Sequence, residues 1–125
     1  MVFEFDNNTP IYLQIIENIK MAIISGEFAP GERLPSVRDL AVQTKVNPNT
    51  MQKAMLELED LGLIYTERTN GKFVTKDTSL LQEYKKTYAY KLTLDFIKDI
   101  QSIGYTVEEA LDYIKDIGGN SECNY

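Results

Sequence analysis

The chain has 125 residues, of which 43% are hydrophobic and 26% charged, with seven glycines and four prolines. This composition is typical of a folded protein with one compact domain and a short appendage, and it excludes a disordered or collagen-like chain. The chain has no histidine and one cysteine, so no disulfide framework is possible and the commonest metal ligand and general base are missing. We therefore expect no metal site, no cofactor and no catalytic residues.

The beginning of the chain has no basic segment followed by an apolar run, and no stretch reaches the ~20 apolar residues of a membrane helix. We expect a cytoplasmic protein that has no membrane partner. The formal net charge of −6 argues against a polyanionic partner unless the positive charges are concentrated in particular segments.

The first predicted helix begins at Thr9-Pro10, since threonine is a good N-cap and proline is tolerated at the first helical position. Its apolar side chains repeat at helical spacing, and Gly26 supplies a left-handed C-cap. The residues of this apolar stripe are Ile11, Tyr12, Ile15, Ile16, Ile19, Ala22 and Ile23.

Two shorter helices follow. Ser36 and Asp39 form a variant of the capping box that starts a helix of about two turns, and this helix ends before Lys45. Asn47-Pro48 repeats the cap-and-proline signal and starts a third helix, which Gly62 ends. The third helix carries apolar residues on one side: Met51, Ala54, Met55, Leu58 and Leu61.

A β-hairpin is predicted next. The segment 63–68 is rich in β-forming residues, Asn70-Gly71 favours a type I′ turn, and residues 72–75 return. Two short helices joined by a tight turn and followed by a two-stranded ribbon describe a winged helix-turn-helix.

The remaining residues predict only helices. Leu80–Ile103 forms one long helix that ends at Gly104, and Thr106 with Glu109 makes a capping box that starts another.

The expected fold is therefore mainly α with a small β-hairpin. It consists of a winged helix-turn-helix domain over residues 1–77 and a helical tail over residues 78–125.

Positive charge is concentrated in two parts of the predicted winged domain. Residues 33–53 carry a net charge of +3, and residues 68–76 contain three cations and no acid. The acids of the third helix all lie in its C-terminal half, and its N-terminal half has none. A surface that faces a nucleic-acid backbone should lack carboxylates, because the phosphates would repel them. This arrangement favours insertion of the third helix into a DNA major groove, although ordinary solvated charges remain the alternative for each residue.

The candidate DNA-binding residues follow from this arrangement. Arg38 is a candidate for bidentate bonds to phosphate or guanine, and the amides of Asn49 and Gln52 are candidates for pairing with adenine. The alternatives are a surface ion pair of Arg38 with Asp39 and a helix-start role for Asn49. The residues that this arrangement nominates are Arg33, Arg38, Lys45, Asn49, Thr50, Gln52, Lys53, Arg68 and Lys72.

The same residues resemble a known family, the GntR-type bacterial transcription regulators. The resemblance spans residues 10–74 and rests on these segments: Pro10-Ile11-Tyr12, Gln14-Ile15, Gly26, Pro30-Gly31, Leu34-Pro35-Ser36, Arg38, Leu40-Ala41, Val46 to Thr50, Ala54, Leu58, Gly62-Leu63-Ile64, Gly71 and Phe73-Val74. The short tail with its Gly104–Ala110 stretch is similar to the YtrA-type subfamily.

The resemblance implies a dimeric winged-helix repressor that binds a palindromic operator. By analogy with the family, DNA contacts fall on Arg38, Asn47, Pro48, Asn49, Thr50, Gln52 and Gly71. The resemblance thus adds Asn47, Pro48 and the wing-tip residues Asn70 and Gly71 to the predicted DNA-binding set. Met51 stands where valine or leucine is usual, Gln52 where some relatives have arginine, and the Asn70–Lys72 tip is less basic than is common. These departures change which operator sequence would be read.

The long tail helix has apolar residues on two sides and therefore needs two partners, of which its neighbouring helix can supply one. We expect the second partner to be another copy of the chain. The predicted dimer interface is Leu81, Tyr84, Tyr88, Leu92, Phe96 and Ile100. The tyrosines and lysines of residues 84–91 leave a base-stacking strip as an alternative.

Two other functions compete with operator binding. The first is a winged-helix module that binds protein or RNA. The second is an enzyme that uses a carboxylate set such as Glu57, Glu59 and Asp60, or Glu108, Glu109 and Asp112, but both sets are expected on solvated helix faces. The sequence does not identify a small-molecule effector.

Overall fold

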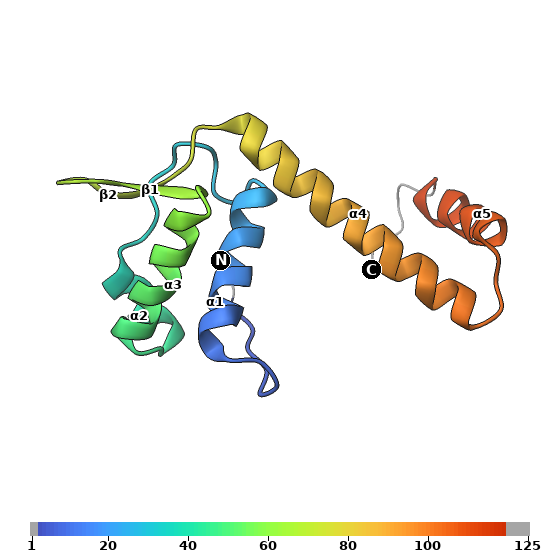
Figure 1. Ribbon diagram of the computed structural model, residues 1–125, viewed down its shortest axis with the longest axis horizontal. Coiled ribbons are helices and arrows are strands. Elements are labelled where there is room, and N and C mark those ends of the chain that lie inside the picture. The colour runs from blue at the N-terminus through green and yellow to red at the C-terminus, as the bar shows by residue number, and fades with distance from the viewer. Residues whose placement is uncertain (1–2, 120–125) are drawn as a thin grey trace. The chain divides into compact units, whose positions relative to one another are not determined.

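The computed structural model describes residues 3–119, which form five helices and one two-stranded antiparallel sheet (Figure 1). The described residues divide into two units, with the boundary between Lys85 and Lys86. In chain order the elements are α1 (Ile11–Ile24), α2 (Val37–Thr44), α3 (Pro48–Asp60), β1 (Ile64–Glu67), β2 (Gly71–Val74), α4 (Thr78–Ser102) and α5 (Val107–Gly118).

The core of the first unit forms around α3, which packs against both α1 and α2. Its buried side faces the apolar stripe of α1, as the helical spacing of both segments predicts. The side chains that are almost completely buried are Ile15, Ile19, Ile23, Met51, Met55, Leu58, Leu63 and Val74.

The helix starts of α2 and α3 confirm the caps that the sequence predicts. The Ser36 hydroxyl accepts a hydrogen bond from the Asp39 amide at 3.0 Å, and the Asn47 carboxamide oxygen accepts one from the Asn49 amide at 2.8 Å. Pro48 occupies the first turn of α3, where no N–H is needed. These caps fix where the two short helices begin.

The predicted cap at Thr9 is wrong. Pro10 precedes the first helical residue, and no side chain caps α1. Gln14 instead bonds the backbone that precedes the helix. Its side-chain N–H donates to the carbonyl oxygens of Thr9 and Asp6, and its side-chain oxygen accepts from the Asp6 amide. The long side chain of Gln14 reaches the preceding loop from inside the helix.

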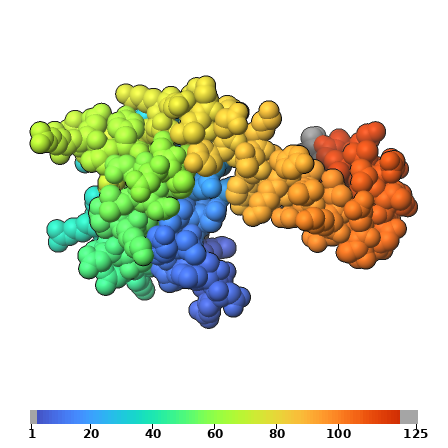
Figure 2. Space-filling view, viewed as in Figure 1, coloured from blue at the N-terminus to red at the C-terminus, as the bar shows by residue number. Residues whose placement is uncertain are grey.

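The β1–β2 hairpin, which we call the wing, projects from the helices of the first unit (Figure 2). The predicted two-residue type I′ turn is wrong: Glu67 pairs with Gly71, so Arg68, Thr69 and Asn70 form a three-residue loop. The Asn70 amide donates to the Glu67 carbonyl at 3.2 Å. Of the wing residues, Gly71 alone has a positive φ, of 103°, so the turn does not require Asn70 to adopt one.

A third segment pairs with the free edge of β2, which the sequence did not predict. The Leu34 amide donates to the Lys72 carbonyl at 2.8 Å, and the Val74 amide donates to the Glu32 carbonyl at 2.9 Å. Arg33 thereby forms an isolated bridge with Phe73. This pairing attaches the α1–α2 connection to the wing.

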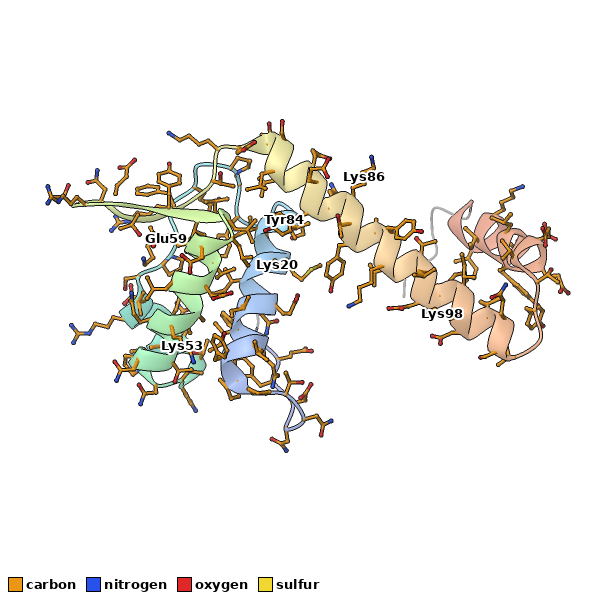
Figure 3. The ribbon with its side chains drawn as sticks, in the orientation of Figure 1. Lys20, Lys53, Glu59, Tyr84, Lys86 and Lys98 are labelled. Carbon is orange, nitrogen blue, oxygen red and sulfur yellow. The ribbon has the colours of Figure 1, made fainter. Side chains whose placement is uncertain are left out.

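The first turns of α4 belong to the first unit, and the unit boundary therefore falls later than the expected boundary at residues 77–78. Leu81 is buried in the core of this unit. The Tyr84 hydroxyl donates to the Leu61 carbonyl at 3.2 Å, and the Lys20 ammonium lies 5.1 Å from the centre of the Tyr84 ring (Figure 3). Both side chains are thus already in contact with this unit.

In the second unit, the capping box that starts α5 is confirmed: Thr106 accepts from the Glu109 amide, and the Glu109 carboxylate accepts from the Thr106 amide. The hydroxyls of Tyr105 and Tyr113 lie 3.3 Å apart, and this hydrogen bond raises the pKa of Tyr113. Among residues 86–119, Ala110 alone is buried. This unit therefore has no apolar core of its own within the described residues.

The packing of α3 makes a direct prediction. Leu58→Ala should lower the free energy of unfolding by about 2–5 kcal/mol, because the side chain is completely buried and its removal leaves a cavity. Leu56→Ala is the matched control: Leu56 is 47% exposed, and its loss should change stability by about 0.5 kcal/mol or less. Urea unfolding of both variants measures the difference, and equal losses would contradict the assigned burial.

Candidate nucleic-acid interface

The N-terminal half of α3 presents a polar surface. Its reverse side is formed by Met51 and Ala54, which are completely buried, and this fixes the rotation of the helix. Asn49, Gln52 and Lys53 are exposed, as the sequence predicts. The buried side of α3 therefore decides that these three polar side chains face outward.

No carboxylate of α3 lies in this half of the helix. Glu57, Glu59 and Asp60 all follow it in the C-terminal turns. Asn47 uses its side-chain oxygen to cap the helix, while Thr50 is half-buried beside the capped end. The surface that results combines amide, hydroxyl and ammonium groups at the positive end of the helix dipole.

Arg38 lies on the exposed side of α2. Within residues 3–119 its guanidinium takes part in no hydrogen bond or ion pair, and the alternative of a pair with Asp39 is not observed there. Arg38 therefore keeps all its donors available for an external acceptor.

Lys45 ends α2 in the left-handed conformation, with φ of 58°. Among the described residues, Lys45 is the one residue other than glycine that has a positive φ. The sharp turn between α2 and α3 requires this conformation, and the exposed lysine carries a positive charge at that turn.

The Lys53 ammonium lies 4.5 Å from the centre of the Tyr12 ring, which holds the side chain between α3 and the first turn of α1 (Figure 3). The sequence assigned Tyr12 to the apolar stripe and gave no signal for this contact, because it joins residues far apart in the chain. The contact restricts Lys53 without burying it.

Four residues of the predicted set lie at the wing, and two of them, Arg33 and Gly71, are close together. A Cβ added at Gly71 would lie 3.3 Å from the Arg33 Nε, so the Arg33 side chain runs close over this glycine. Arg68 is exposed in the loop, and its guanidinium has no hydrogen bond or ion pair within the described part of the chain. The Asn70 side chain donates to the Glu67 carboxylate at 3.1 Å.

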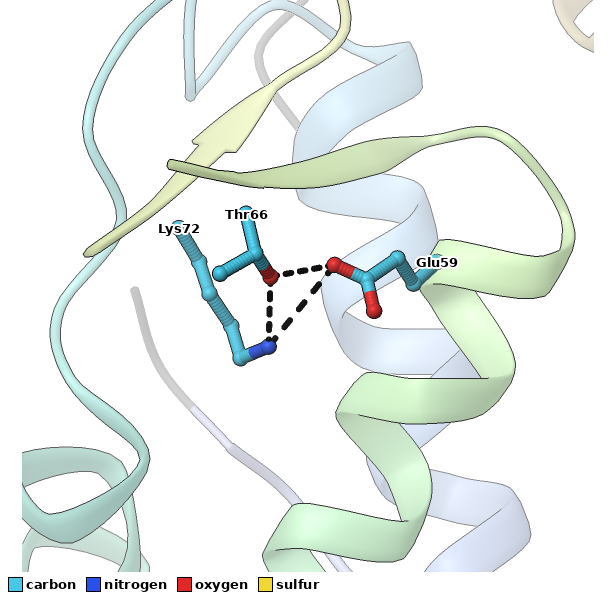
Figure 4. A network of polar contacts seen from close by, with 3 residues as sticks. All are labelled: Glu59, Thr66 and Lys72. Carbon is cyan, nitrogen blue, oxygen red and sulfur yellow. Dashed lines mark hydrogen bonds and ion pairs between the residues drawn. The ribbon is translucent and has the colours of Figure 1, made fainter. Parts of the chain in front are cut away.

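Lys72, the remaining wing residue of the predicted set, is not free. Its ammonium donates to the Thr66 hydroxyl at 2.9 Å and lies 3.9 Å from the Glu59 carboxylate, and the Thr66 hydroxyl donates to the same carboxylate (Figure 4). The Lys72 side chain is only 14% exposed.

No group of three or more histidine, cysteine, aspartate or glutamate side chains in residues 3–119 is arranged to hold a metal ion. Among these residues, no helix combines the length and hydropathy needed to cross a lipid bilayer.

The sequence profile of the bacterial regulatory proteins of the gntR family matches residues 11–74, which extend from the start of α1 to the end of β2. The chain belongs to the GntR family. The family match thus covers the three helices and the wing that carry the candidate interface.

Two relatives from Bacillus subtilis (strain 168) extend the similarity of this GntR-family chain into the tail. The uncharacterized HTH-type transcriptional regulator YhcF is 40% identical over 112 residues, which are 90% of this chain and 93% of YhcF. The HTH-type transcriptional repressor YtrA is 37% identical over 115 residues, which are 91% of this chain and 88% of YtrA.

Solved structures of GntR regulators have the same winged-helix fold. A GntR family transcriptional regulator from Listeria monocytogenes superimposes with a TM-score of 0.81 and 37% identity, covering 90% of this chain and 99% of that one. The AraR DNA-binding domain in complex with operator ORX1 superimposes with a TM-score of 0.54 and 30% identity, covering 58% of this chain and 93% of AraR's.

The turn at Lys45 allows a matched pair of variants. Lys45→Gly and Lys45→Ala remove the same charge, but only glycine adopts a positive φ without steric cost. We expect Lys45→Gly to be more stable than Lys45→Ala by about 1 kcal/mol, measured by urea unfolding. Equal stabilities would mean that the turn relaxes in the alanine variant.

Proposed function

We propose that the protein is a transcription regulator that binds a palindromic DNA operator as a homodimer and represses the genes beside it. In each protomer α3 enters the major groove, and the wing lies on the adjacent minor groove. The observation that carries the proposal is the exposed, acid-free N-terminal half of α3, whose rotation is fixed by its buried reverse side.

The chemistry of this surface suits base recognition. The amides of Asn49 and Gln52 each offer a donor and an acceptor, the pattern that matches the N6 and N7 atoms of adenine. Such a bidentate pair discriminates between bases by about 1–3 kcal/mol. The unpaired guanidinium of Arg38 suits either a guanine edge or a phosphate.

Other groups suit the phosphate backbone. The N-terminal end of α3, with the Thr50 hydroxyl, is a favourable place for an anion. Arg33, Lys45, Lys53 and Arg68 bring positive charge to the α2–α3 turn, to α3 and to the wing. Contacts of this kind position the protein on the duplex without reading its sequence.

The relatives support the proposal in two ways. The AraR structure holds an operator on a domain with the same fold, and YtrA, which is similar over nearly the whole length of this chain, is named a repressor. A regulator of this kind works where the chromosome lies, so we infer a cytoplasmic location in a bacterium. Its family consists of regulatory proteins, and we assign it no catalytic role.

The second unit supports the homodimer. Its described residues bury only Ala110, while Leu92, Phe96 and Ile114 are each at least 40% exposed. An apolar groove of about 460 Å³ opens between α4 and α5. The groove is lined by Phe96, Ile100, Tyr113, Ile114, Ile117 and Gly118.

A second copy of the chain would cover these side chains and supply the core that the unit lacks. Of the interface residues that the sequence predicts, we retain Tyr88, Leu92, Phe96 and Ile100. Leu81 and Tyr84 are removed from the set, because both already contact the first unit.

Selection of bound fragments from random duplex DNA tests the proposal. We expect one palindromic motif, and binding to it should weaken with salt so that log K falls by several units per log unit of salt. Equal affinity for all sequences, or no binding, would favour a winged-helix module for protein or RNA.

Arg38→Ala should weaken binding to the selected duplex by at least about tenfold, because a charged contact to the DNA is lost. The variant should unfold at the same urea concentration as the unaltered protein, because Arg38 is exposed. Lys115→Ala, in the last turn of α5, removes a positive charge outside the proposed interface and should leave affinity unchanged. Unchanged binding of Arg38→Ala would remove this residue from the site.

Phe96→Glu should raise the dimer dissociation constant by at least about tenfold, since it introduces a charge into the apolar groove. Lys98→Glu, an exposed position on the same helix that does not line the groove, is the matched control. Sedimentation analysis of both variants measures the effect. A Phe96→Glu protein that dimerises as well as the control would show that the interface lies elsewhere.

A further inference from the structure

The hydrogen-bonded set Glu59, Thr66 and Lys72, which we call the wing network, joins the last turns of α3 to both strands of the wing (Figure 4). We propose that the wing network fixes the orientation of the wing relative to α3, and that Lys72 is a positioning residue and not a phosphate contact. The inference rests on the proposed DNA-binding function and adds a role for a carboxylate that faces the wing.

The register of the hairpin places the network on one face of the wing. Thr66 and Lys72 are directly paired across the strands, so their side chains lie on the same face, toward Glu59. The neighbouring pair, Tyr65 and Phe73, lies on the opposite face, where the two rings stack 5.6 Å apart. One face of the wing is thus tied to α3 by polar contacts.

The hydrogen-bonding capacity of the three groups is well matched. The Thr66 hydroxyl donates to the Glu59 carboxylate and accepts from the Lys72 ammonium, so it uses both functions at once. The Glu59 and Lys72 side chains are 30% and 14% exposed. Water therefore competes less for the Lys72 ammonium than for the exposed guanidinium of Arg68.

Lys72 is a poor phosphate contact because its ammonium already lies beside the Glu59 carboxylate. A cation that already lies beside a carboxylate must lose that partner, or bring its negative charge along, in order to bind a second anion. Arg33 and Arg68 have no ion pair within residues 3–119 and are the available cations of the wing region.

The wing needs such a support because it is a two-stranded hairpin, which by itself is only marginally stable in water. Its angle to α3 decides whether the wing loop reaches the minor groove when α3 lies in the major groove. A small rotation at the strand ends next to α3 displaces Arg68 and Asn70 at the other end. The wing network restricts this rotation, because it bonds Glu59 of α3 to the Thr66–Lys72 pair, which lies one pair before the loop end of the strands.

The decisive experiment compares two carboxylates of α3. Glu59→Gln should weaken binding to the selected duplex by about three- to tenfold, since it disrupts the wing network. Glu57→Gln is the matched control: Glu57 is exposed and outside the network, and loss of its negative charge should leave affinity unchanged or raise it. If Glu59→Gln binds as tightly as Glu57→Gln or more tightly, the proposal is overturned.

A second comparison separates positioning from direct contact. In a Lys72→Met background, Arg68→Ala should cost at least about threefold less affinity than in the unaltered protein, because the wing is no longer held against the DNA. Arg38→Ala, on α2, should cost the same in both backgrounds. Strictly additive effects of Lys72→Met and Arg68→Ala would show that Lys72 acts independently of the wing's position.

The Thr66 hydroxyl provides a rescue test. Thr66→Val should weaken binding as Glu59→Gln does, whereas Thr66→Ser keeps the hydroxyl and should restore affinity to within about twofold of the unaltered protein. Thr87→Val, at an exposed position of α4 outside the proposed DNA interface, is the control for loss of a threonine hydroxyl. A Thr66→Val protein that binds as well as the control would contradict the network.

The network is also measurable without DNA. In the free full-length protein, Glu59→Gln and Lys72→Met should each raise hydrogen exchange of the β1 and β2 amides by about tenfold, with no change in the core amides of α1. If no duplex is selected and wing exchange still rises, the proposed function fails while the network stands as a structural support. Unchanged wing exchange in both variants would overturn the network itself.

Discussion

Burial of one side of α3 is the constraint on which the remainder of the candidate interface depends. The completely buried side chains Met51, Ala54, Met55 and Leu58 pack where α1 and α2 meet the helix. Exposure of these residues would cost several kcal/mol, so the helix has a single stable rotation about its axis. That rotation turns Asn49, Gln52 and Lys53 outward, and the recognition surface is therefore a consequence of core packing.

The net charge of the whole chain and the distribution of charge along α3 have different consequences. The net charge of −6 describes the whole chain and does not describe its candidate interface. Acids occupy the C-terminal turns of α3, where Glu59 holds Lys72 and Thr66, while the N-terminal half has none. The same helix thus offers an acid-free surface at one end and a carboxylate support for the wing at the other.

Local sequence signals correctly predicted where a helix begins when a short polar side chain caps the first turn of that helix. Ser36, Asn47 and Thr106 all act as predicted, since each needs only an amide two or three residues ahead. Thr9 fails because Gln14, from within the helix, bonds the backbone before it. The type I′ turn fails because the Glu67–Gly71 pairing leaves three residues in the wing loop.

The sequence by itself determined the helices, the hairpin and the exposed polar half of α3, because periodicity, caps and spacing act over a few residues. The family followed from the resemblance of residues 10–74 to GntR regulators. The tertiary structure decided which partners meet across long separations. It brought Arg33 to Gly71, Lys53 to Tyr12, Tyr84 to Leu61, and Lys72 to Glu59. These contacts form only after the core has brought distant segments together, and no local pattern of residues encodes the distance between such segments.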